Sequence, residues 1–177
     1  MVPCLKATWA PVGQTPVVRH RNRWHRKVSV IGALAIEPDG SHVELLSDWH
    51  ADRHVTKDEV AAFLAKLLLQ YPDRPITLIW DKLQAHRSAL VKQVLMDNPR
   101  RMTMHFLPSY APDLNPVEMV WSLSKYHRMA NHGIDDLQRL HDEAVRQVQR
   151  VADGPSLMHA CIKHAGLADA LYQASAQ

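Results

Sequence analysis

Two acidic residues lie where the chain passes from one expected element into the next. Asp81 directly follows the apolar run Ile76–Trp80, which its composition predicts to be a strand. Glu118 comes three residues after Asn115, a favourable helix N-cap that is followed by proline. Two carboxylates at such junctions could bind metal and begin a phosphoryl-transfer site. The structural alternatives are a turn aspartate that caps the next loop and a glutamate that completes a capping box.

Two further side chains could share that chemistry. Lys125 follows Glu118 at i+7 on the same expected helix, where it could meet a phosphate or be solvated. His86 follows Asp81 by five residues and could line the same pocket, or could be a surface or capping histidine. A dinucleotide-binding or P-loop glycine motif is absent from the sequence, so nucleotide binding is not supported.

The chain carries 12 histidines, and His50 and His54 have a spacing that could bind a transition metal. They lack the matching acid of a zinc-protease helix motif, and we expect an exposed loop there. A histidine-rich metal hydrolase, with Zn²⁺ bound at His50 and His54, is therefore only the third hypothesis for this chain.

A basic cluster surrounds a tryptophan near the N-terminus. The cluster holds five Lys or Arg side chains, which suit phosphate contact, and the tryptophan could stack on a base. The alternative is a solvated hairpin tip, because charge runs are commonly solvated faces. Its members, with Lys125 the candidate DNA-binding residues, are Arg19, Arg21, Arg23, Trp24, Arg26 and Lys27.

The periodicity of apolar residues predicts a mixed α/β layer fold rather than a barrel. The run at 76–80 is apolar throughout, as expected of a strand buried on both faces by helices. We expect one domain over residues 1–177, with a core at about 8–130 and C-terminal helices at 134–165. Predicted strands lie at 28–36, 41–46, 76–80 and 102–107, with a further candidate at 7–10, and predicted helices at 57–71, 88–96, 116–129, 137–152 and 156–164.

The bulk composition indicates a globular protein. Hydrophobic residues make up 46% and charged residues 22% of the 177 positions, and no apolar run has the roughly 20 residues that a membrane span needs. The two cysteines are far apart, so we expect no disulfide framework and a reducing cytoplasm as the compartment.

Four segments match, in order, the motifs of one enzyme family. Residues 8–16 look like a Trp-Ala-Pro-x-Gly-x-x-Pro segment, and residues 28–34 resemble the strand after it. Asp81 with His86 is similar to a D-N-x-x-x-H block, and residues 110–118, with Trp121 and Lys125, closely resemble the block that holds the last acid. The chain thus resembles DDE transposases of the mariner superfamily, in its bacterial insertion-sequence branch.

The resemblance implies an RNase H-like mixed sheet flanked by helices, and cut-and-paste DNA transposition. Two Mg²⁺ (or Mn²⁺) ions bridged by three carboxylates would activate water and then a DNA 3′-hydroxyl for attack on a phosphodiester. Asp81 and Glu118 match the second and third acids, whereas Asp113 is expected to order the loop. The implied partners are transposon ends and target DNA and a second copy of the chain or the missing N-terminal part, in a bacterial cytoplasm and with no membrane.

One departure from the family concerns the first acid. The family carries it in a D-E-x-G-F segment on the strand before Trp-Ala-Pro, and Met1 lies only eight residues before Trp9. We therefore expect the sheet to lack its first strand, and Asp48 and Asp52 do not match the missing position. The interpretation is the C-terminal part of a transposase (a remnant, a misassigned start or half of a split frame) that is inactive alone. The alternative is a non-catalytic nucleic-acid-binding fragment that uses the basic cluster.

Overall fold

The computed structural model describes residues 6–15, 17, 27–131, 134 and 136–167. Within that part of the chain, none of the helices combines the length and hydropathy needed to cross a bilayer. Contacts divide the chain into two compact units. The first comprises residues 1–53 and 116–177, and the second comprises residues 54–115.

The first unit begins with an antiparallel hairpin of β1 (Val28–Ile36) and β2 (Val43–Ala51). The register pairs Val28 with Ala51 and Ile36 with Val43. Gly40 in the turn has φ +69°, a left-handed conformation that glycine adopts without steric penalty. The prediction of the first strand and the turn is thus confirmed.

The second strand is longer than its predicted range of 41–46. It continues to Ala51, so Asp48 and His50 lie within β2 rather than in the expected exposed loop. Pairing along the whole of β1 places these polar residues in a strand, because the backbone bonds of an antiparallel pair do not depend on side-chain hydropathy.

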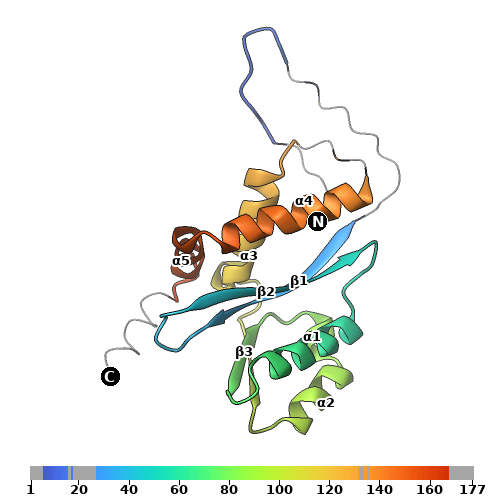
Figure 1. The fold of residues 1–177 in the computed structure, drawn as a ribbon, viewed down its shortest axis with the longest axis vertical. Coiled ribbons are helices and arrows are strands. Elements are labelled where there is room, and N and C mark those ends of the chain that lie inside the picture. Colours follow the sequence, from blue (N-terminus) through green and yellow to red (C-terminus); the bar gives the residue numbers. More distant parts are fainter. Residues whose placement is uncertain (1–5, 16, 18–26, 132–133, 135, 168–177) are drawn as a thin grey trace. The chain divides into compact units, whose positions relative to one another are not determined.

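Three helices of the same unit accompany the hairpin: α3 (Pro116–Ser122), α4 (Leu137–Ala152) and α5 (Pro155–His164) (Figure 1). The expected helix at 116–129 is α-helical only as far as Ser122 and continues as a π-helix, η3, over Leu123–Arg128. The buried core joins one residue of α3 to pairs from α4 and α5, with hairpin side chains packed against them. Its fully enclosed members are Val120, Val148, Val151, Met158 and Cys161.

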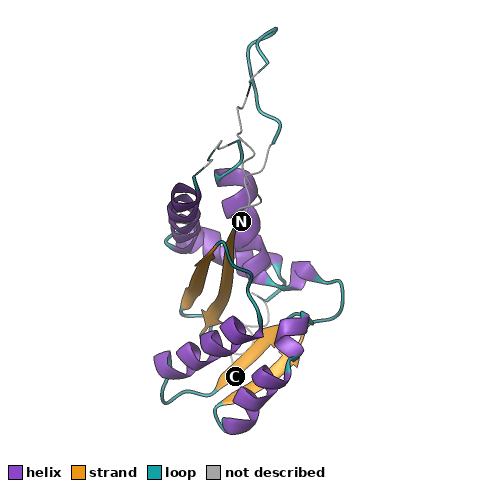
Figure 2. Ribbon diagram, turned by 90° about the vertical axis from the view of Figure 1, so that its right-hand side faces the viewer, coloured by secondary structure: helices purple, strands orange, loops and turns teal. Residues whose placement is uncertain are grey.

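The second unit contains α1 (Lys57–Gln70), β3 (Ile76–Trp80), α2 (Ala89–Asp97) and β4 (Met102–Phe106) (Figure 2). A capping box begins α1, as predicted: the Thr56 side chain accepts from Asp58 N, and Glu59 accepts from Thr56 N. Strands β3 and β4 are parallel, with Ile76 opposite Met102. The boundaries of β3 agree with the predicted strand, and those of α2 and β4 agree within one residue.

The prediction that β3 is buried on both faces is wrong. Leu78 is 9% exposed, whereas its neighbour Ile79 is 60% exposed. Successive side chains of a strand point to opposite faces, so only one face of the pair is covered in this structure. The candidate strand at 7–10 is also absent, because those residues form neither helix nor strand.

The described residues thus combine antiparallel and parallel strands with helices, in two sheets of two strands each. This is the mixed α/β class that the sequence predicts. That residues 1–177 form a single domain stays a prediction.

Candidate functional site

Asp81 is the first residue after β3, and local hydrogen bonds hold its carboxylate. Leu83 N donates to Asp81 Oδ1 at 3.0 Å, which is the capping role expected of a turn aspartate. His86 Nδ1 lies 2.8 Å from the same oxygen. The Asp81 side chain is 53% exposed, and that of His86 is 16% exposed. The structure therefore brings together the predicted acid and the histidine five residues later.

A short 3₁₀-helix, η1 (Gln84–Arg87), turns His86 back toward Asp81. The His86 ring stacks on Trp80, with ring centroids 4.3 Å apart and an interplanar angle of 5°. His86 Nδ1 also lies 3.3 Å from the main-chain oxygen of Asp81. The His86 ring is thus held between the face of Trp80 and the carboxylate of Asp81.

The loops that follow β3 and β4 meet at the carboxyl end of the parallel pair. Leu107 N donates to Trp80 O at 2.8 Å, and Lys82 Nζ donates to Ser109 Oγ at 3.2 Å. Lys82 occupies the place where the D-N-x-x-x-H block has asparagine. Ligands of α/β sheets bind at this end of the strands, so Asp81 and an ammonium group lie where a phosphate could bind.

Glu118 lies in the first turn of α3 and is exposed. The neighbouring Val117 and Val120 are buried, with 8% and 0% exposure, and Val120 belongs to the core of the first unit. A carboxylate is favoured in this turn by the partial positive charge of a helix N-terminus. Asp81 and Glu118 thus belong to different units, and each is positioned by its own local structure.

Lys125 lies in the π-helical segment, and its Nζ is 4.9 Å from the centre of the Tyr126 ring. The buried Ser124 donates its Oγ proton to Val120 O at 2.8 Å, and Met129 N bonds to Ser124 O, a spacing of five residues. The α-helical spacing that related Lys125 to Glu118 therefore does not apply beyond Ser122. A DNA-binding role for Lys125 stays a prediction.

Most of the predicted basic cluster falls outside the described residues. Arg19, Arg21, Arg23, Trp24 and Arg26 all lie there. Lys27 is described, and its main-chain oxygen accepts from Asp52 N at 2.9 Å beside the end of the hairpin. The role of the cluster in DNA binding stays a prediction.

No group of three His, Cys, Asp or Glu side chains suited to a metal ion forms among the described residues. His50 lies in β2 and His54 in the loop before α1. The donor chemistry of Asp81 nevertheless suits a divalent cation, because hard cations such as Mg²⁺ take carboxylate oxygens.

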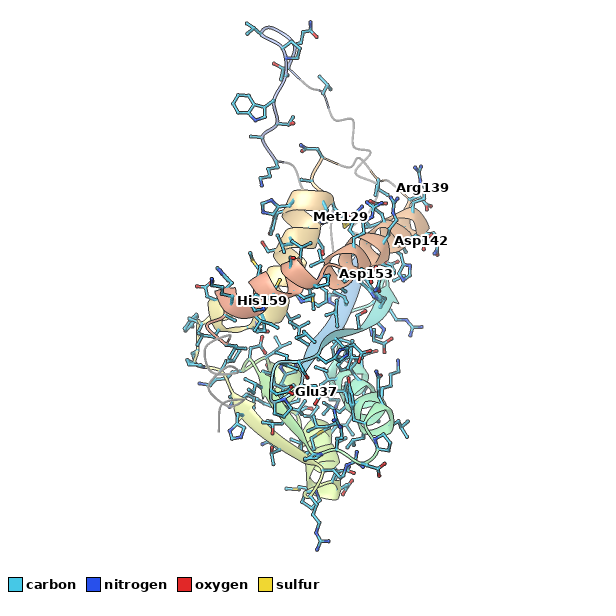
Figure 3. All side chains as sticks on the ribbon, turned by 60° about the vertical axis from the view of Figure 1, so that its left-hand side comes forward. Glu37, Met129, Arg139, Asp142, Asp153 and His159 are labelled. Carbon is cyan, nitrogen blue, oxygen red and sulfur yellow. The ribbon has the colours of Figure 1, made fainter. Side chains whose placement is uncertain are left out.

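A groove of about 450 Å³ lies along α4, and no motif in the sequence indicates it. Figure 3 labels Asp142 on this helix and Asp153, the residue that caps its C-terminal end. Hydrogen bonds from His141 and Gln138 lower the pKa of Asp142 below its ordinary value. The groove mixes acidic and basic side chains of one helix and contains neither candidate acid. Its lining residues are His141, Asp142, Val145, Arg146, Gln149, Arg150 and Asp153.

The sequence profile described as "DDE superfamily endonuclease" matches residues 2–141, which include Asp81 and Glu118. The chain belongs to this superfamily. No curated protein matches the sequence significantly.

The fold is similar to that of solved mariner transposase structures. The Mos1 mariner paired end complex with Mn aligns with a TM-score of 0.61 at 18% identity over 99% of this chain and 51% of the other. The Mos1 strand transfer complex aligns with a TM-score of 0.62 at 17% identity over 98% of this chain and 50% of the other. The chain spans about half the length of these proteins. The likeness confirms the α/β, RNase H-like fold class.

Proposed function

We propose that this DDE endonuclease chain takes part in the transposition of a bacterial insertion sequence, as a metal-dependent nuclease and strand transferase. The proposal rests on the family match, which includes both acids, together with the Asp81 carboxylate that His86 contacts at the end of β3. Asp81 and Glu118 are its catalytic and metal-binding residues. When bound, Mg²⁺ or Mn²⁺ would activate a water or hydroxyl nucleophile and stabilise charge on the attacked phosphodiester.

The chain's own residues contribute binding and orientation to this reaction. The Asp81 carboxylate is fixed by Leu83 N and His86, so little reordering is needed when it takes up a ligand. Lys82 at the same end of β3 supplies a positive charge for a phosphate. The basic cluster at residues 19–27 and Lys125 contact the DNA backbone.

The partners in this proposal are transposon ends, target DNA and a second copy of the chain, in the bacterial cytoplasm and on nucleoid DNA.

Mn²⁺ binding tests the two acids directly, with electron paramagnetic resonance as the measurement. Asp81→Asn and Glu118→Gln should each weaken Mn²⁺ binding by about tenfold or more, because each removes a charged ligand. Asp113→Asn is the matched control, since Asp113 belongs to the same motif as Glu118 and is proposed only to order the loop. Equal Mn²⁺ affinity in the wild type and the Asp81 and Glu118 variants would refute the proposed metal site.

A non-catalytic nucleic-acid-binding fragment is the alternative. Replacing Arg19, Arg21 and Arg23 with alanine should weaken binding to duplex DNA and lower its salt dependence. A control variant loses three exposed charges elsewhere, at Lys66, Lys92 and Arg100. Two results together would favour this alternative. DNA binding would depend on the cluster, and Mn²⁺ would change the DNA binding of the wild type and of the Asp81→Ala variant equally.

A further inference from the structure

Asp81 presents its two carboxylate oxygens in different ways. Both side-chain bonds, from Leu83 N at 3.0 Å and His86 Nδ1 at 2.8 Å, go to Oδ1. Among the described residues, Oδ2 has no hydrogen-bond donor. The side chain is 53% exposed, so solvent reaches the carboxylate while Oδ1 is engaged.

We propose that His86 is a positioning residue that holds Asp81 Oδ1 so that Oδ2 is directed to a divalent cation. The proposal rests on the proposed function, because it assumes that Asp81 is a metal ligand. Carboxylates that bind metals are commonly held by hydrogen bonds from behind, and these partners change metal affinity by about 10- to 100-fold.

The Trp80 ring determines where the histidine can point. Parallel stacking at 4.3 Å fixes the plane of the His86 ring, and the 3₁₀ turn η1 fixes how far His86 lies from Asp81. In that plane Nδ1 faces both Oδ1 and the main-chain oxygen of Asp81, at 2.8 and 3.3 Å. Two acceptors at one ring nitrogen require that Nδ1 carries the proton. The neighbouring Leu83 N–H adds the second donor to Oδ1, so rotation of the carboxylate would break two bonds.

Two substitutions separate the hydrogen bond from the stacking. His86→Phe keeps an aromatic ring on Trp80 and removes the donor, whereas His86→Asn removes the ring and keeps an N–H near the position of Nδ1. If His86 positions Asp81, His86→Phe should weaken binding of Mn²⁺ alone by about tenfold, and His86→Asn should bind Mn²⁺ within about threefold of the wild-type affinity. If His86 serves only the fold, His86→Asn should lower the melting temperature, and His86→Phe should bind Mn²⁺ as the wild type does.

Asp81→Asn distinguishes failure of this inference from failure of the proposed function. Loss of Mn²⁺ binding in Asp81→Asn with no loss in His86→Phe would overturn the positioning role and leave the metal site standing. No loss in Asp81→Asn would overturn both. Nitrogen NMR gives a readout without metal: a proton on His86 Nδ1 is expected, and Nδ1 without a proton would contradict the proposal.

Discussion

The two units cover their strands differently. In the hairpin unit, the described large apolar side chains that are most exposed lie in the N-terminal segment, at Trp9 and Val12. In the parallel-strand unit the most exposed is Tyr110, in a loop, but others lie on the elements themselves, as with Leu69 on α1 at 80% and Met96 on α2 at 69%. The hairpin unit therefore packs its regular elements into its core more completely than the parallel-strand unit does.

The difference also separates the two candidate acids. Glu118 is positioned by packing, because Val120 on the same helix is enclosed in the core of the hairpin unit. Asp81 is positioned by polar contacts, through Leu83 N and His86, at the end of a strand with one open face. Packing holds a helix, and a hydrogen-bonded turn holds a single carboxylate. The comparison predicts that variants of the two units respond differently.

The largest effect is expected from two neighbours on β3. Leu78→Ala should lower the free energy of unfolding by about 2–5 kcal/mol, because it removes a buried side chain and leaves a cavity. Ile79→Ala is the matched control, and it should change that free energy by less than about 1 kcal/mol because most of this side chain is already in solvent. Urea unfolding measures both. Equal losses would mean that the second face of β3 is covered in solution.

A smaller effect is expected where the hairpin meets α3. A Cβ on Gly32 would lie 2.8 Å from two atoms of the Trp121 six-membered ring. Gly32→Ala should therefore destabilise the protein by about 1–3 kcal/mol through overpacking. Thermal unfolding of the variant measures this loss.

The control for that variant is the same change in a Trp121→Phe background. The smaller ring lacks the two contacting atoms, so Gly32→Ala should cost less there, with a residual penalty from the main-chain oxygen of Leu46, 3.1 Å from the added Cβ. An unchanged penalty in both backgrounds would show that the close approach of Trp121 is not its cause.

The smallest effect concerns a surface charge on α4. Hydrogen bonds from His141 and Gln138 lower the pKa of Asp142 below its ordinary value of 3.8. Its stabilising contribution is therefore present above that value and is lost as the pH falls through the folded pKa. The free energy of unfolding, measured across the acid range for the wild type and Asp142→Asn, should depend slightly less on pH in the variant. Identical pH profiles would contradict this assignment.

The sequence predicted most elements because their signals are local. The capping box at Thr56, the apolar run before Asp81 and the Pro-Asp-Gly turn each fix a boundary within a few residues. The site was predicted in part for the same reason: Asp81 and His86 are five residues apart, and one 3₁₀ turn joins them.

The features that the sequence did not predict depend on partners distant in the chain. The polar end of β2 becomes a strand only because β1 supplies its backbone bonds. Which face of β3 is covered depends on the helices that pack against it, and a run of apolar residues does not indicate this. The π turn at Leu123–Arg128 contains the buried Ser124, whose hydroxyl bonds to Val120 O, and a 3.6-residue period in the sequence does not reveal it.

The hairpin unit is discontinuous in sequence, because residues 54–115 of the other unit separate its two segments. On a ribosome, the hairpin emerges well before the helices α3, α4 and α5 that complete its core. The inserted unit is continuous, and its paired strands lie closer in sequence than the two segments of the hairpin unit, so we expect it to fold first. The first unit can then be completed only after α3, α4 and α5 have been synthesised, and until that point β1 lacks the helices that pack against it.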